Sequence, residues 1–140
     1  MTAEVPDRMV YQRRVYAMLT TPLEDYFDDP RHPRPEAFAM VSTACGRGYV
    51  AHWSIKRNKL YLARVHPIVM PLVLSESVKD AYQRYFALVF GNTSAPKFAD
   101  WFSGELQLGY GDLDDRFDTC YVYQNEIKLQ VLRGVLVNQP

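Results

Sequence analysis

The stretch Tyr49-Val-Ala-His-Trp-Ser-Ile-Lys-Arg-Asn-Lys-Leu-Tyr-Leu-Ala-Arg-Val65 has the pattern of two β-strands joined by a polar turn. Side chains alternate between the two faces of a strand, so every second residue shares a face. One face of the first strand is almost wholly apolar and consists of Tyr49, Ala51, Trp53 and Ile55. The stretch therefore predicts a central hairpin that turns this face into the core.

The polar turn at Arg57-Asn58 decides which residues face each other across this hairpin. With a two-residue turn, Ile55 lies opposite Leu60 and Trp53 lies opposite Leu62, which brings apolar side chains into cross-strand contact. Arginine is a poor residue for the turn types that suit two-residue hairpins, because both central residues then need a positive φ. A longer loop, which would shift this register, stays open.

Further strand patterns lie on both sides of the central hairpin. The segments with short apolar or alternating patterns are 9–11, 15–19, 105–108, 121–131 and 135–137. Polar turn residues separate most neighbouring segments, so sequential strands are expected to pair as hairpins. A polar loop is expected at 109–118.

Helical patterns are fewer. Residues 75–90 carry apolar side chains at helical spacing and stop at Gly91. Pro22 opens a short helix, and 97–104 predicts a short helical turn. The chain is therefore expected to form an α+β domain, with a mostly antiparallel sheet of six or seven strands built from sequential hairpins and packed by one medium helix and one or two short helices.

Length and net charge bear on the number of domains and on the kinds of partner that the chain could bind. With 140 residues the chain predicts a single globular domain, with a polar leader at about 1–7. The counts of Lys+Arg and Asp+Glu are both 16, so the overall charge favours neither nucleic acid nor a membrane as partner and leaves homodimerisation open. Neither a signal peptide nor an apolar run of about 18 residues is present, which predicts a cytoplasmic protein.

Chemistry-bearing residues are sparse. Cys45, Arg47 and His52 lie close in sequence, and a thiolate nucleophile needs a base and a positive charge nearby. A loop cysteine and a half-exposed strand histidine explain the same spacing, so no catalytic residue is assigned. The acidic run 112–118 lacks the glycine and glutamate of a calcium loop, and no phosphate-binding signature occurs. The sequence thus predicts no metal and no cofactor.

Three segments carry a resemblance. Gly46-Arg-Gly-Tyr-Val-Ala-His-Trp-Ser-Ile55, Leu60-Tyr-Leu62 and Phe98-Ala-Asp-Trp-Phe-Ser-Gly-Glu-Leu106 resemble a pattern of small single-domain bacterial proteins of unknown function, over positions 43–136. In size and organisation the chain also resembles bacterial immunity proteins. That resemblance implies inhibition of a toxin by binding and implies no catalytic residue.

The leading hypothesis is a cytoplasmic bacterial protein-interaction domain without catalytic activity. Tyrosine is favoured at interfaces, and five tyrosines are too many to bury with satisfied hydroxyls. The candidate partner-binding residues are Tyr11, Tyr16, Tyr110, Tyr121 and Tyr123.

The alternative hypothesis is a small-molecule binder or an enzyme of unrecognised type. Its pocket would lie between the sheet and the helix at 75–90, near Cys45, Arg47, His52 and Asp100. A deep cavity in which these polar groups converge would favour this alternative, whereas a packed interior would favour partner binding.

Overall fold

Strands dominate the described part of the chain, which also holds two α-helices and one 3-10 helix. The computed structural model describes residues 6–38, 47–67, 76–91, 93–113 and 123–138. Its elements are β1 (Asp7–Tyr11), β2 (Arg14–Met18), α1 (Pro22–Phe27), the 3-10 helix η1 (Glu36–Phe38), β3 (Tyr49–Lys56), β4 (Lys59–Pro67), α2 (Val78–Phe90), β5 (Lys97–Phe98), β6 (Gly104–Leu113), β7 (Tyr123–Leu132) and β8 (Val135–Asn138).

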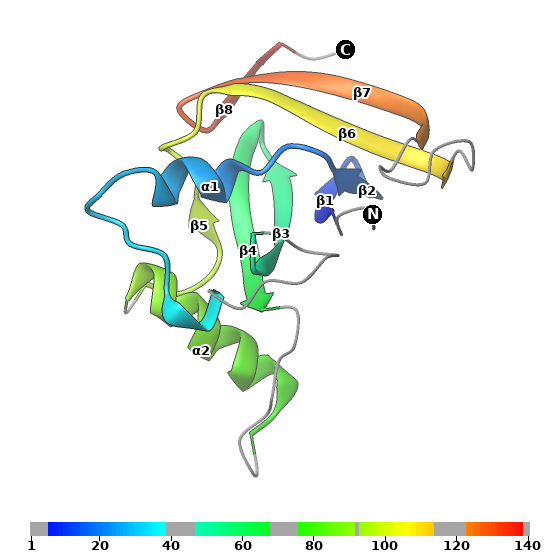
Figure 1. Ribbon diagram of the computed structural model, residues 1–140. Coiled ribbons are helices and arrows are strands. Elements are labelled where there is room, and N and C mark those ends of the chain that lie inside the picture. Colours follow the sequence, from blue (N-terminus) through cyan, green and yellow to red (C-terminus); the bar gives the residue numbers. More distant parts are fainter. Residues whose placement is uncertain (1–5, 39–46, 68–75, 92, 114–122, 139–140) are drawn as a thin grey trace.

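The strands form one sheet that closes on itself. Their order is β3-β1-β2-β6-β7-β8-β4-β5, and an additional β3–β4 pairing joins the two ends into a seven-stranded mixed barrel with β5 at its side (Figure 1). The α+β class and the mostly antiparallel sheet are confirmed. The expectation of six or seven strands built from sequential hairpins missed the short edge strand β5. It also missed the closure, because β1 pairs in parallel with β3 across some forty residues of chain.

Three two-residue turns set the hairpin registers. Both central residues have positive φ at Gln12-Arg13, at Arg57-Asn58 and at Arg133-Gly134, the geometry of a type I′ turn. The predicted pairing across the central hairpin is confirmed: Ile55 faces Leu60 and Trp53 faces Leu62. The right-handed twist of the strands therefore selects this turn even where arginine occupies it.

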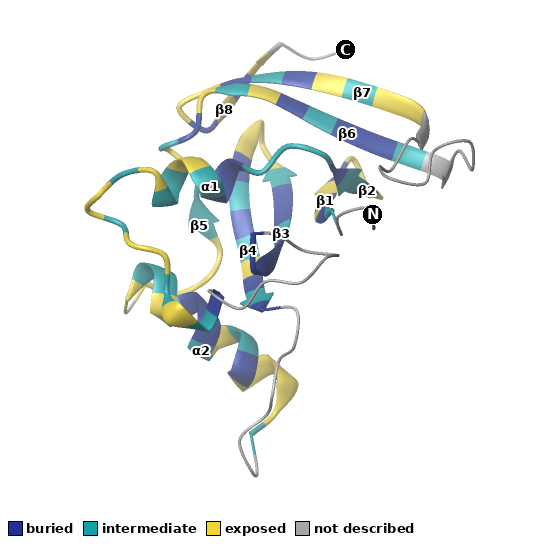
Figure 2. Ribbon diagram, viewed as in Figure 1, coloured by how far each residue is buried: buried dark blue, intermediate teal, exposed yellow. Residues whose placement is uncertain are grey.

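Buried positions alternate with exposed ones along many of the strands and lie on one side of α2 (Figure 2). Trp53, Leu62 and Leu129 are fully buried as expected, whereas Ile55 and Ile127 are half-buried and pack against the core. The largest fully buried side chains are Trp53, Tyr49, Phe38, Phe86, Met9, Met18, Leu23, Leu60, Leu62, Leu106, Leu108 and Leu129. The barrel interior is thus occupied by side chains.

Three local expectations were wrong. Residues 97–98 form the edge strand β5 instead of a helical turn, because the Ala99 amide donates to the Leu60 carbonyl of β4. Strand β6 runs to Leu113, into the predicted polar loop. Asp7, placed in the polar leader by sequence, is a fully buried residue of β1.

Helix α2 packs against the outside of β4. It begins at Val78, where the Ser77 side chain accepts a hydrogen bond from the Asp80 amide, and it ends before Gly91. Its buried residues are Ala81, Tyr85 and Phe86, and the helix contacts β4. In Figure 1 it lies at the opposite end of the molecule from the long β6–β7 ribbon. No helix in the described ranges is long and apolar enough to cross a bilayer.

Candidate functional site

A groove of about 650 Å³ lies between α2 and β4. This is where the sequence places the pocket of the alternative hypothesis. Its lining residues are Ala63, Arg64, Val78, Lys79, Asp80, Tyr82, Gln83, Phe86 and Ala95. Arg47, His52 and Asp100, the described members of the predicted polar set, are not among these residues. Cys45, the fourth member, lies outside the described residues.

The first turns of α2 and the middle of β4 build this groove. The Arg64 guanidinium lies 4.6 Å from the centre of the Tyr82 ring, a cation–π contact between strand and helix. Arg64 and Lys79 are exposed, and Asp80 is the one acid among the described lining residues. The groove therefore combines aromatic surface with a rim that is more positive than negative.

Two histidines meet beside the groove, on the outer face of β3 and β4. The Nε2 atoms of His52 and His66 are 3.3 Å apart. The Nδ1 atom of His66 lies 2.8 Å from the Pro67 carbonyl oxygen, which can only accept, so Nδ1 carries the proton. In the neutral pair, His52 then donates from Nε2 to His66 Nε2.

Proton binding to His52 is disfavoured in this position. Burial lowers the pKa of His52 to about 4, and His66, Arg64 and Arg8 add repulsion between positive charges. Sequence alone identified His52 as a candidate but did not pair it with His66. The pairing depends on a register shift of β3 against β4 between His52 and Trp53, which no local pattern indicates.

Arg47, the second catalytic candidate, belongs to a buried ion pair. Its Nη2 donates to Asp7 Oδ1 over 2.6 Å, and Asp7 also accepts from the Ala51 amide at 2.9 Å and the Trp53 indole at 3.2 Å. Burial raises the pKa of the Asp7 carboxyl, while the charge of Arg47 and the N–H donors oppose that rise. These contacts give Arg47 a structural role at the barrel wall.

The polar network continues toward α1. The Tyr49 hydroxyl donates to Glu24 Oε2 at 2.8 Å, and Arg34 binds the same carboxylate through Nη2 at 2.8 and 2.9 Å. Arg34 also donates to the Arg47 carbonyl oxygen. Burial raises the pKa of Tyr49, so this phenol stays protonated and acts as a donor. The network joins α1 to β3 and exposes no free nucleophile.

The predicted partner-binding tyrosines fall into buried, half-buried and undescribed residues. Tyr11 and Tyr16 are core residues with 4% and 8% exposure, and Tyr110 is half-buried against Tyr16. Tyr121 and the side chain of Tyr123 lie outside the described residues, as does Cys45. The three described tyrosines therefore pack together, with Tyr11 and Tyr16 in the core and Tyr110 at its edge.

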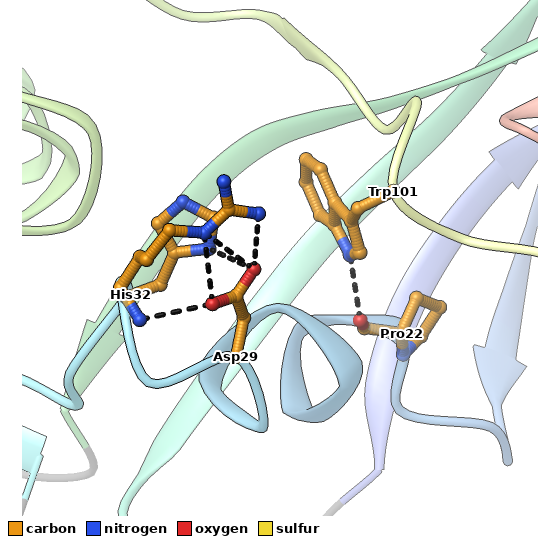
Figure 3. A network of polar contacts seen from close by, with 5 residues as sticks. Pro22, Asp29, His32 and Trp101 are labelled. Atoms are coloured by element: carbon orange, nitrogen blue, oxygen red, sulfur yellow. Dashed lines mark hydrogen bonds and ion pairs between the residues drawn. The ribbon is translucent and has the colours of Figure 1, made fainter.

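A different aromatic cluster was missed by the sequence analysis. Tyr26 stacks on His32 at 3.9 Å between ring centres and also contacts Phe90 and Trp101. Asp29 holds the loop by pairing with Arg31, and the Trp101 indole donates to the Pro22 carbonyl oxygen (Figure 3). The members come from α1, the loop after α1, the end of α2 and the turn after β5, so only the tertiary structure could reveal them.

Comparison with known proteins adds no assignment. No family model matches the chain, and neither a curated protein nor a solved structure shows significant similarity to it. Among the residues that the structure describes, no group of three or more His, Cys, Asp or Glu side chains could hold a metal ion. The function is therefore inferred from the geometry of the surface.

Proposed function

We propose that this protein acts by stoichiometric binding of another protein, which docks in the groove between α2 and β4. The main support for the proposal is that the polar candidate residues described by the structure do not line the groove. Asp7 and Arg47 are paired inside the wall of a filled barrel, and the groove is lined by residues without a converging catalytic set. A filled interior beside an accessible aromatic surface suits binding better than turnover.

The groove favours a partner with acidic and apolar side chains. Arg64 and Lys79 supply positive charge at the rim, and Arg8 on β1 pairs in register with His52 next to it. Tyr82 supplies half-exposed aromatic surface, and aromatic side chains contribute strongly to interfaces. Complementary charge would steer a partner that presents carboxylates beside apolar groups. An immunity protein that blocks a bacterial toxin is the specific form of this proposal.

The test is recovery of a partner that depends on the groove. The tagged chain is used to capture proteins from the native host and is co-expressed with the products of neighbouring genes. We expect the double variant R64E/K79E to lose at least about tenfold in affinity for the recovered partner, because two favourable charges become repulsive. Affinity is measured by calorimetry, and circular dichroism checks that the variant is folded.

A matched control has the same change in charge elsewhere. Lys56 and Lys128 are exposed and are absent from the groove lining, so K56E/K128E should keep the affinity within about twofold. Recovery of no protein partner, or an equal loss in this control, contradicts the proposal.

A small-molecule binder is the second candidate, because the groove volume of about 650 Å³ falls within the usual range of ligand sites. It would use Arg64, Lys79 and Tyr82, since Arg47 and His52 do not line the groove and Cys45 lies outside the described residues. An anionic compound that raises the melting temperature of the wild type but not of R64E/K79E would favour it, provided that no protein partner is recovered.

A further inference from the structure

The two facing histidines have a geometry that fits a metal ion as well as a shared proton. We propose that His52 and His66 form a two-imidazole site for a divalent first-row metal ion of the zinc type, with water in the remaining positions. Neutral imidazole is a common ligand of such ions. The proposal concerns the outer face of β3 and β4 and does not depend on the proposed docking function.

The separation of the nitrogens carries the inference. A zinc–nitrogen bond is about 2.0–2.1 Å long, so two such bonds at a tetrahedral angle place their nitrogens about 3.3–3.4 Å apart. The Nε2 atoms of His52 and His66 are 3.3 Å apart, and their ring centres are 5.4 Å apart. Both rings thus hold Nε2 at the separation that a tetrahedral zinc ion requires.

Contacts around His66 fix the tautomer and the orientation of its ring, as in a metal ligand. Metal-bound histidines generally donate their second ring N–H to a carbonyl or carboxylate, which fixes the tautomer and the ring orientation. His66 Nδ1 donates to the Pro67 carbonyl oxygen over 2.8 Å, which leaves the lone pair on Nε2. Its ring also packs against Tyr82 with ring centres 5.5 Å apart. The orientation of His66 is therefore set before any metal binds.

Metal binding replaces one hydrogen bond and leaves the proton count unchanged at neutral pH. In the metal-free pair His52 Nε2–H donates to His66 Nε2. When the ion binds both Nε2 atoms, the proton of His52 moves to its Nδ1, through exchange with solvent that the half-buried ring allows.

Neighbouring positive charges limit the affinity and provide a signature. Arg64 faces His52 across the strand pair, and Arg8 faces it from β1. Both guanidinium groups repel a bound cation, so removal of one should strengthen binding. The variant R64Q is expected to bind Zn²⁺ several-fold more tightly than the wild type, an effect that a purely structural histidine pair would not give.

The experiment is calorimetric titration of the full chain with ZnCl₂ at neutral pH. H52A and H66A are each expected to weaken Zn²⁺ binding at least about tenfold, because each removes one of two protein ligands. The chain contains a third histidine, His32, which stacks on Tyr26 away from this pair and serves as the matched control. H32A is expected to change the affinity by less than about twofold.

The two thiols require their own control, because cysteine is also a zinc ligand. The double variant C45S/C120S is expected to retain Zn²⁺ binding with wild-type affinity. Loss of binding in C45S/C120S, an equal loss in H32A, or no binding to the wild type at millimolar Zn²⁺ overturns the proposal. Unfolding curves in the presence of a chelator check that H52A and H66A are folded.

Discussion

His52 illustrates what a single residue gains from its position. In the sequence it is a polar residue on the solvent-exposed face of a predicted strand. In the structure it is half-buried beside His66, with Arg8 and Arg64 as neighbours in register, and its pKa is lowered to about 4. The consequence is a histidine that stays neutral where an exposed one begins to take up a proton.

The free energy of unfolding should therefore fall as the pH is lowered, because His52 takes up a proton more readily in the unfolded chain. The folded pKa lies below the ordinary 6.5, so between pH 6.5 and about 4 the unfolded chain binds the extra proton and unfolding becomes easier as pH falls. We expect a loss of about 1–2 kcal/mol across this window, after allowance for solvent screening of the half-buried ring. Urea unfolding with a chelator present should show this dependence in the wild type.

The comparison that isolates His52 is the variant H52Q, in which the titrating group is absent. Between pH 6.5 and about 4, the free energy of unfolding of H52Q should fall by about 1–2 kcal/mol less than that of the wild type. Equal pH dependence in H52Q and the wild type would assign the effect to other groups.

The hairpins show how local sequence and backbone geometry can disagree within one element. Arg57 and Asn58 both have positive φ, 53° and 63°. Asparagine adopts this region readily, but arginine does so at a cost because its Cβ crowds the following carbonyl. The turn is tight because Lys56 pairs with Lys59 and Ile55 with Leu60, and this pairing buries apolar groups. Cross-strand packing therefore outweighs the preference of one turn residue.

Replacing the strained turn should stabilise the hairpin. The double variant R57N/N58G places the favoured Asn-Gly pair in the type I′ turn, and we expect a gain of about 1 kcal/mol in the free energy of unfolding. Chemical denaturation measures the gain. R57V, which puts a β-branched residue at the same positive φ, should lose stability, and a gain in R57V would contradict this account of the turn.

At the scale of the whole molecule, the barrel closes through a few long-range contacts. Strand β1 joins β3 in parallel, and β2 joins β6 through only two residue pairs. Asp7 reinforces the first of these junctions by binding Arg47, the Ala51 amide and the Trp53 indole. A buried carboxylate with these partners favours this register, because a shift would separate the buried charges and leave polar groups unpaired.

Removal of Asp7 should therefore weaken the whole fold. D7A leaves the Arg47 charge buried without its carboxylate, and we expect a loss of about 3–5 kcal/mol in the free energy of unfolding by urea. D7A/R47M should recover part of that loss, because the buried guanidinium is removed together with the carboxylate that binds it. D100A changes an exposed acid and should stay within about 0.5 kcal/mol of the wild type. A loss below about 1 kcal/mol in D7A would refute a stabilising role for the pair.

The sequence by itself determined the hairpins. Next to the turn, the pairing of Ile55 with Leu60 and of Trp53 with Leu62 follows from alternating side chains and a two-residue turn, and α2 follows from helical spacing that ends at Gly91. These signals are local, because the residues that interact are few positions apart and their pattern repeats along the chain.

Only the tertiary structure decided how the elements combine. The parallel β1–β3 junction, the burial of Asp7 against Arg47 and the meeting of His52 with His66 depend on contacts between distant segments. Such contacts have no fixed spacing in sequence, and a polar residue such as Asp7 looks the same in a leader as in a barrel wall. Burial and a specific partner, which only the folded chain supplies, separate the two cases.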